Sequence, residues 1–282
     1  MNMKKIGIVG AGQMGCGIAQ VCAAAELEVV LSDVSEDALN SAKDLIGRNF
    51  AKRVQAGKMS ASDATAALER ITVSTNLSDF SDCDCVIEAA TESARVKEQI
   101  LASLEAVIRP DAVLATNTSS VSITSLGAAV VQSSRFIGMH FFNPVPAMTL
   151  VEVIRGMRTD EATSAAANEF AERLGKHAIS VMNSPGFVVN RILIPMINEA
   201  ILVLQEGLAS AVDIDEGMKR GANHPIGPLA LADLIGLDTV LAIMTVLQGE
   251  FGDPKYRPAL LLREMVAAGA LGRKSGQGFH TY

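Results

Sequence analysis

The feature that most constrains the fold of this chain is a glycine-rich turn near its beginning. An apolar run at residues 6–9 leads into the turn, a helical pattern follows, and a second apolar run at 29–31 closes on Asp33. This order of strand, glycine turn, helix, strand and acid is typical of a dinucleotide-binding βαβ unit. A GxGxxG turn alone is weak evidence, because other α/β proteins contain glycine-rich turns. Here the flanking elements favour a dinucleotide, and the turn reads Gly10-Ala11-Gly12-Gln13-Met14-Gly15.

Each part of this unit has a physical task. Gly10 lets the chain turn sharply, Gly12 lets a pyrophosphate approach the backbone, and Gly15 lets the helix pack closely on the strands. The first turn of the helix offers unpaired N–H groups and a partial positive charge to the phosphates. Asp33, at the end of the second strand, is placed to accept hydrogen bonds from the adenosine ribose.

Composition argues against several other classes of protein. Hydrophobic residues make up 49% of the 282 residues, yet no stretch approaches the roughly 20 unbroken apolar residues of a membrane span. The net charge of -7 argues against nucleic acid or an anionic membrane as the main partner. The first strand begins almost at residue 1, which leaves no room for a signal peptide. We expect a cytoplasmic enzyme without a metal site and with reduced thiols at Cys16, Cys22, Cys83 and Cys85.

Strand and helix patterns alternate up to residue 182, which predicts a Rossmann-like, doubly wound and mainly parallel sheet. Further strands are predicted at 71–74, 85–88, 113–116, 136–139, 150–154 and 178–182, and helices at 35–57, 60–70, 93–108, 122–126 and 159–174. Beyond residue 186 only helices are predicted, at 187–206, 212–222, 228–235, 238–250 and 258–268. The first of these is apolar on nearly every side and is expected to be buried. We therefore predict an α/β domain over 1–184 and an all-α domain over 185–282.

Polar residues follow several of the predicted strands. Glu92, Asn117, Thr118 and Ser119 fall at carboxyl ends of strands, where ligands of such sheets bind. Thr118, Ser119 and Ser120 have an alternative role as caps of the short helix at 122–126.

His140 stands out among the four histidines because it has a candidate partner. It follows one predicted strand, and Glu152 lies in the next, across a proline-containing loop. A carboxylate beside a histidine favours its charged form and selects one tautomer, which suits a general base near neutral pH. The alternative is a histidine packed among aromatic residues in the core.

A basic cluster lies on the helix at 35–57 and just beyond it. An anionic ligand and a solvated helix face both explain such a cluster, which consists of Lys43, Arg48, Lys52, Arg53 and Lys58. Asn190, in the apolar helix at 187–206, either satisfies backbone groups of the preceding loop or points into a cleft.

Together these segments resemble the short-chain (S)-3-hydroxyacyl-CoA dehydrogenase family, in particular its bacterial branch that acts on 3-hydroxybutyryl-CoA. The resemblance extends over essentially the whole chain. It rests on the glycine turn and on Asn117-Thr118-Ser119-Ser120, His140-Phe141-Phe142-Asn143-Pro144, Pro185-Gly186-Phe187-Val188-Val189-Asn190-Arg191 and Gly272-Arg273-Lys274-Ser275-Gly276.

The resemblance implies an NAD-dependent oxidoreductase that interconverts (S)-3-hydroxyacyl-CoA and 3-oxoacyl-CoA. It implies that His140 is the general base and Glu152 orients it, while Ser119 and Asn190 bind substrate oxygens. It also implies that Lys52 reaches the coenzyme A phosphates, and that the helical domain forms a homodimer and one wall of the cleft. The implied NAD contacts, besides residues 10–15, are Asp33, Glu92, Lys97, Ser119, Asn143 and Lys274.

Two alternatives remain open. A related hydroxy-acid dehydrogenase acting on a free small acid has the same architecture, and the basic residues at 35–58 argue against it. A catalytically silent structural relative is the second, and the presence of Ser119, His140, Glu152 and Asn190 argues against that.

Overall fold

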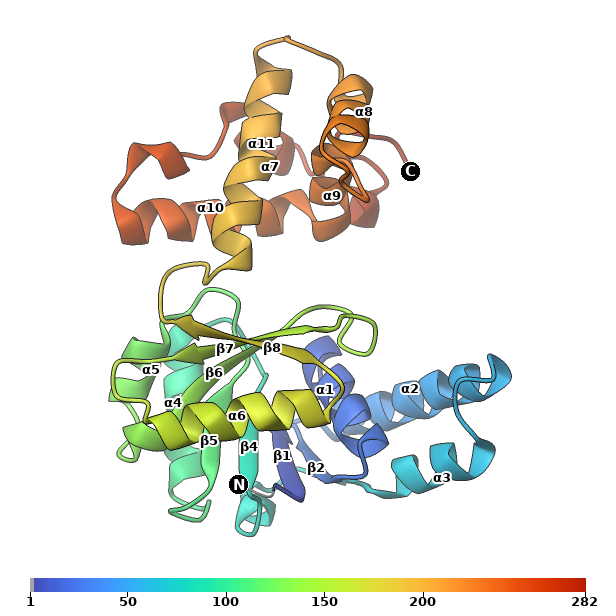
Figure 1. Ribbon diagram of the computed structural model, residues 1–282, viewed down its shortest axis with the longest axis vertical. Coiled ribbons are helices and arrows are strands. Elements are labelled where there is room, and N and C mark those ends of the chain that lie inside the picture. The colour runs from blue at the N-terminus through green and yellow to red at the C-terminus, as the bar shows by residue number, and fades with distance from the viewer. Residues whose placement is uncertain (1–2) are drawn as a thin grey trace. The chain divides into compact units, whose positions relative to one another are not determined.

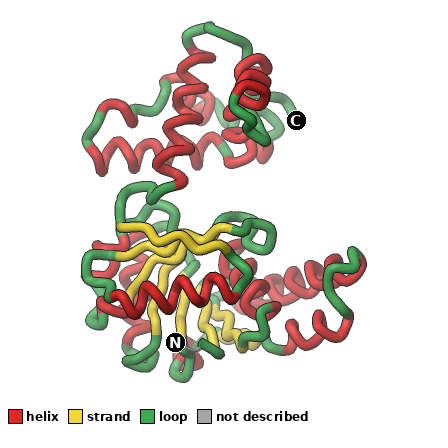
Figure 2. The backbone as a smooth tube through the Cα atoms, viewed as in Figure 1, coloured by secondary structure: helices red, strands yellow, loops and turns green. Residues whose placement is uncertain are grey.

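The computed structural model describes residues 3–282, which divide into two compact units between Ser184 and Pro185 (Figure 1). The described part of the first unit is one eight-stranded sheet with helices around it. The second is built from helices, with isolated β-bridges near the C-terminus (Figure 2). The predicted fold class, a doubly wound and mainly parallel sheet followed by a helical domain, is confirmed.

The sheet brings the carboxyl ends of several strands to one edge. Its strands are β1 (Lys5–Val9), β2 (Glu28–Ser32), β3 (Ile71–Ser74), β4 (Cys85–Glu88), β5 (Val113–Thr116), β6 (Phe136–Phe141), β7 (Leu150–Arg155) and β8 (His177–Met182). Their order is β3-β2-β1-β4-β5-β6-β7-β8, and all neighbours are parallel except β6 and β7. The chain reverses its direction of progress between β1 and β4. Ligands of open α/β sheets bind beyond the carboxyl ends at such a switch point.

The helices of the first unit begin where capping residues predict them. They are α1 (Gln13–Ala24), α2 (Glu36–Gln55), α3 (Ala61–Glu69), α4 (Ala94–Glu105), α5 (Ile123–Ala128) and α6 (Glu161–Arg173). The hydroxyl of Ser35 accepts from Ala38 N–H at 3.2 Å and so caps α2, and Ser60 caps α3 in the same way. In Figure 1, α6 crosses in front of the strands, and α4 and α5 lie behind them.

Alternation along the strands decides which side chains face α4 and α5. Ile87, Ala115 and Met139 pack in the core cluster that includes residues of α1, α2 and α6. Successive side chains of a strand point to opposite faces. Their neighbours Glu88, Thr116 and His140 therefore share the other face, as does Glu152, whose neighbours Val151 and Val153 belong to the same cluster.

The second unit has its own apolar core. Its helices are α7 (Val189–Gln205), α8 (Ala211–Gly221), α9 (Pro228–Ile235), α10 (Leu237–Phe251) and α11 (Leu260–Ala267). Ile197 and Ile201 of α7 pack with Met244 and Leu247 of α10, all fully buried. The expected burial of α7 on every side is wrong, because Ile192 is 67% exposed. Within this unit α7 packs on α8, α9, α10 and α11.

Within residues 3–282, no single helix has the length and apolar composition needed to cross a membrane. The helices α9 and α10 have this length and composition only when taken together, and they are bent by 97° relative to each other.

Some predicted ends differ from the observed ones. The helix expected to reach residue 108 ends at Glu105, whose carboxylate accepts from the N–H groups of Val131 and Gln132. The strand expected to end before His140 continues through Phe141, because His140 and Phe141 still pair with residues of β7. Short 3-10 helices, such as that at Leu77–Phe80, were not predicted.

Candidate active site

The glycine turn has the geometry that a bound pyrophosphate requires. Gly10 adopts φ +103°, and a Cβ on Gly15 would lie 1.8 Å from the carbonyl oxygen of Gly10. A Cβ on Gly12 would meet no heavy atom within 4 Å, so the space at this residue is open. Helix α1 begins after Gly12 without a side-chain cap and without acidic residues in its first turn. Its first N–H groups are therefore suited to phosphate oxygens.

Asp33 holds the glycine turn in place. Its Oδ2 accepts from Ala11 N–H at 2.8 Å, and its Oδ1 accepts from Ser35 N–H at 3.0 Å. A carboxylate has about four acceptor sites, so these two bonds leave capacity for ribose hydroxyls. The open space at Gly12, the uncapped helix and this carboxylate together fit a dinucleotide. The contact of Asp33 with NAD stays a prediction.

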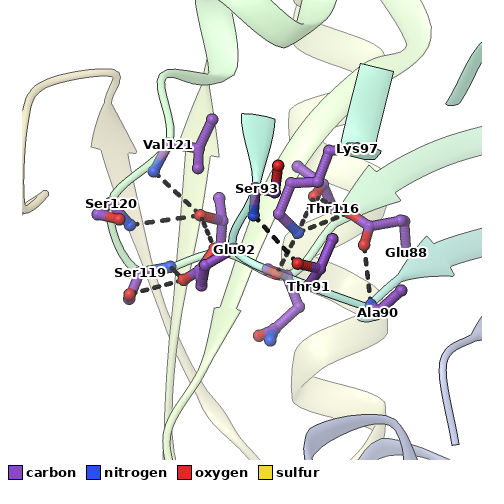
Figure 3. Close-up of polar contacts among 12 residues, drawn as sticks. Glu88, Ala90, Thr91, Glu92, Ser93, Lys97, Thr116, Ser119, Ser120 and Val121 are labelled. Atoms are coloured by element: carbon purple, nitrogen blue, oxygen red, sulfur yellow. Dashed lines mark hydrogen bonds and ion pairs between the residues drawn. The ribbon is translucent and has the colours of Figure 1, made fainter. Parts of the chain in front are cut away.

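Glu92 joins two loops that the sequence separates (Figure 3). Its Oε1 accepts from both the N–H and the hydroxyl of Ser119, each at 2.7 Å, and its Oε2 accepts from the hydroxyl of Thr118 at 2.7 Å. Thr118 also accepts from the N–H groups of Ser120 and Val121, but Ser122 caps α5, so the alternative role of Thr118, Ser119 and Ser120 as helix caps is wrong. In this arrangement the hydroxyl hydrogen of Ser119 is engaged by Glu92.

Lys97 is enclosed next to these loops (Figure 3). It has no exposed surface, and its ammonium lies 2.6 Å from Glu88 Oε2, 3.2 Å from Thr116 Oγ1 and 3.0 Å from the carbonyl oxygen of Asn117. An ammonium has three N–H donors. The contact between Lys97 and NAD stays a prediction, but all three donors already have acceptors here.

His140 and Glu152 form a buried pair. The two residues are direct partners in the antiparallel pairing of β6 and β7, which places both side chains on one face. His140 Nδ1 lies 2.7 Å from Glu152 Oε2, and the residues are 7% and 0% exposed. The ring of Phe142 packs at 4.4 Å, centroid to centroid. With Nδ1 engaged by the carboxylate, Nε2 is the nitrogen suited to exchange a proton with a substrate.

A buried lysine anchors the loop that follows His140. Lys176 Nζ donates to the carbonyl oxygens of Val145 and Met148 at 2.6 and 2.7 Å, and burial lowers the pKa of this ammonium. The loop also carries Asn143, whose side chain is exposed. Lys176 thus restrains the segment between the two strands that hold the histidine and the glutamate.

The cysteines do not supply a nucleophile. All four are free and buried, and burial raises the pKa of each thiol, to about 12 for Cys83. Protonated thiols are poor nucleophiles at neutral pH.

Three further predicted residues belong to other elements. Lys52 is exposed in the last turn of α2. Asn190 and Lys274 belong to the second unit, where Asn190 lies in the first turn of α7 and Lys274 pairs with Asp238 at 2.6 Å. Their roles stay predictions.

Three residues of the site region were not identified from the sequence. Glu88, Thr116 and Lys176 each bind main-chain or side-chain groups next to the predicted residues. Glu88 carried a usable signal, because a charged residue that closes the apolar run 85–87 needs a buried partner. Nothing comparable marks Thr116 or Lys176.

Comparisons with known proteins agree along the whole chain. Residues 5–184 match the family model described as the 3-hydroxyacyl-CoA dehydrogenase NAD binding domain, and residues 186–282 match that of the C-terminal domain. The chain is 52% identical over 280 residues to the 3-hydroxybutyryl-CoA dehydrogenase of Bradyrhizobium diazoefficiens, covering 99% of this chain and 96% of that protein. It is 51% identical over 278 residues to a probable 3-hydroxybutyryl-CoA dehydrogenase of Deinococcus radiodurans, with 99% and 100% covered.

A crystal structure is similarly close. The (S)-3-hydroxybutyryl-CoA dehydrogenase PaaH1 from Ralstonia eutropha superposes with a TM-score of 0.98 at 55% sequence identity, covering 100% of this chain and 99% of the other. The chain therefore belongs to the 3-hydroxyacyl-CoA dehydrogenase family, a family of enzymes whose first domain binds NAD.

Proposed function

We propose that this enzyme interconverts (S)-3-hydroxybutyryl-CoA and acetoacetyl-CoA with NAD, and that His140 is its general base. The observation that carries the proposal is the buried His140–Glu152 pair, 2.7 Å apart, at the same edge of the sheet as the glycine turn. Relatives that bear the name 3-hydroxybutyryl-CoA dehydrogenase support the choice of acyl group.

The proton is handled by His140 in this scheme. Bound NAD supplies the acceptor for the hydride that leaves C3 of the substrate. His140 Nε2 takes the proton of the 3-hydroxyl, and Glu152 at Nδ1 fixes the tautomer and stabilises the imidazolium that forms. In the reverse direction the imidazolium returns this proton to the oxygen at C3.

Ser119 and Asn190 are proposed to bind substrate oxygens. The hydroxyl of Ser119 donates to Glu92, so it can accept from the 3-hydroxyl of the substrate through its lone pairs. To donate to the carbonyl of the 3-oxo product it has to leave Glu92. Ser119 therefore keeps its bond to Glu92 when the alcohol is bound and gives it up when it donates to the ketone.

The other proposed contacts follow from the family resemblance. We propose that Asn143, Glu92 and Lys274 contact NAD, in addition to Asp33 and residues 10–15. A homodimer formed through the C-terminal helices is part of the proposal, and the exposed apolar side chains of Ile192 and Leu260 support it.

The proposal is tested by a substrate comparison with NADH. Acetoacetyl-CoA is expected to be reduced with a higher kcat/KM than 3-oxoacyl-CoA substrates of longer chain, and much more efficiently than free acetoacetate. Consumption of NADH measures all three. Efficient reduction of free acetoacetate would instead favour a dehydrogenase of small free acids, and no turnover of any substrate would indicate a silent relative.

Lys52→Ala is expected to raise the KM for acetoacetyl-CoA about tenfold, and the effect is expected to shrink at high salt. Lys52 is exposed, so a contact with a coenzyme A phosphate is partly solvated and screened. An N-acetylcysteamine thioester lacks these phosphates, and its kcat/KM is expected to be the same in both proteins.

The matched control is Lys4→Ala, which removes an exposed lysine at the amino end of β1, away from the carboxyl edge. This variant is expected to leave kcat/KM unchanged for both substrates. Equal losses for both substrates in Lys52→Ala, or no loss for either, would show that the basic helix is only a solvated face.

A further inference from the structure

A buried ion pair lies between the loops of the carboxyl edge (Figure 3). Glu88 ends β4, Lys97 lies on α4, and neither side chain is exposed. Thr116, at the end of β5, donates its hydroxyl hydrogen to Glu88 Oε2 at 2.6 Å. Desolvation of two charges offsets much of their attraction, so a buried ion pair is weak evidence for a stabilising role. The main-chain atoms that the ion pair binds indicate a different role.

Lys97 binds Asn117, and Asn117 in turn binds the residue that follows the proposed base. The Asn117 carbonyl accepts from the ammonium at 3.0 Å, and its N–H donates to the carbonyl oxygen of Glu88 at 2.7 Å. Its side-chain Oδ1 accepts from the N–H of Phe141 at 3.0 Å, and Phe141 directly follows His140. Asn117 is thus fixed through three atoms. A shift of this residue moves both the main chain beside the base and the loop that carries Ser119.

Glu88 also holds the segment against which the glycine turn packs. Its Oε1 accepts from the N–H of Ala90 at 2.8 Å. A Cβ on Gly10 would lie 2.7 Å from both the carbonyl oxygen of Ala89 and Cα of Ala90, so the two segments are already in close contact. The position of Ala90 therefore limits the position of the turn.

We propose that Glu88 and Lys97 are positioning residues for the dehydrogenase reaction. Lys97 holds the Asn117 carbonyl, Glu88 holds the Ala90 amide, and their ion pair ties these two loops together. The inference rests on the proposed role of His140. Removal of the ammonium is expected to slow hydride transfer much more than it weakens NADH binding, because the ammonium has no donor left for the cofactor.

Two variants separate positioning from stability. Lys97→Met removes the ammonium and leaves the Glu88 carboxylate buried and unpaired. The double variant Glu88→Gln/Lys97→Met removes the unpaired charge, but the Asn117 carbonyl still lacks its lysine donor. Leu101→Ala is the matched control, because Leu101 is fully buried one turn further along α4 and belongs to no polar network of the site. It destabilises the same helix through a cavity.

Each protein is measured in four ways: kcat for acetoacetyl-CoA at saturating NADH, the Kd for NADH, the deuterium isotope effect with NADH labelled at the transferred position, and Tm. Lys97→Met is expected to lower kcat by about 10–100-fold and to raise the isotope effect, with the Kd for NADH within about threefold of wild type. Its Tm is expected to fall by about 5 °C or more.

The double variant gives the decisive comparison. Its Tm is expected to return close to that of wild type, while kcat stays at least about tenfold low. Leu101→Ala is expected to lose Tm with kcat within about twofold of wild type. If Lys97→Met does not fold, the double variant, which carries no unpaired charge, still compares kcat directly with wild type.

Two results would overturn the inference. Recovery of kcat together with Tm in the double variant would make the pair structural only. A rise of tenfold or more in the Kd for NADH, with kcat near wild type at saturation, would make Lys97 a direct cofactor contact. Turnover of the wild type is measured first, so failure of the proposed function is seen in that protein, and failure of this inference is seen only in the variants.

Discussion

His140→Gln is expected to lower kcat for acetoacetyl-CoA reduction by about 10²–10⁴-fold, the usual contribution of a general acid or base. The Kd for NADH is expected to stay nearly unchanged, because the residue lies at the end of β6 and not in the glycine turn. A glutamine side chain can still hydrogen-bond to Glu152, so the buried carboxylate keeps a partner. The loss should therefore fall on the proton transfer rather than on the fold, and Tm checks this.

Two further variants provide a second test of the pair and a control. Glu152→Gln is expected to lower kcat as well, because the amide neither stabilises the imidazolium nor selects the same tautomer. His177→Gln is the matched control, since His177 is exposed at the start of β8, and it should leave kcat unchanged. A His140→Gln enzyme with near-normal kcat would show that this histidine is a packed core residue after all.

NADH is expected to be preferred over NADPH by about a hundredfold or more in kcat/KM. Asp33 follows β2 and would lie beside the 2′-phosphate of NADPH, and the fully exposed Val34 provides no cation to offset it. Two like charges about 4 Å apart repel by roughly 4 kcal/mol at an effective dielectric constant near 20. A hundredfold preference corresponds to about 2.7 kcal/mol, which leaves room for solvent screening.

Val34→Arg tests this explanation without disturbing the turn. Asp33 keeps its bonds to Ala11 and Ser35 in this variant, so NADH should be used almost as well as before. Activity with NADPH is expected to rise, because the guanidinium pairs with the extra phosphate. Equal kcat/KM values for the two cofactors in the unmodified enzyme would contradict the proposed role of Asp33.

The elements themselves were largely predictable, because each depends on local pattern. Ser35 and Ser60 cap their helices as expected, and the glycine turn has the close contacts that its spacing implies. The face of α7 that remains exposed was not predictable. Hydrophobic residues on every side of a helix indicate that the helix buries apolar surface somewhere, but not whether the partner is its own chain.

Long-range polar contacts were the least predictable part of the site. The pairing of His140 with Glu152 was predicted because a short loop joins their strands. The bonds from Glu92 to Ser119 and from Lys97 to Asn117 cross between loops that meet only when β4 and β5 pair in register. No local pattern carries that information. A buried lysine such as Lys97 looks, in the sequence, like any solvated lysine on a helix.

The antiparallel pairing of β6 and β7 makes the proposed catalytic pair dependent on the register of the two strands. His140 and Glu152 face each other because β6 and β7 pair in this one register. A slip of one residue would turn Glu152 to the opposite face of the sheet, where α6 packs. Insertions or deletions that change this register would therefore separate His140 from Glu152 even though they alter neither residue. A change in this hairpin keeps the pair intact only if histidine and glutamate stay opposite each other.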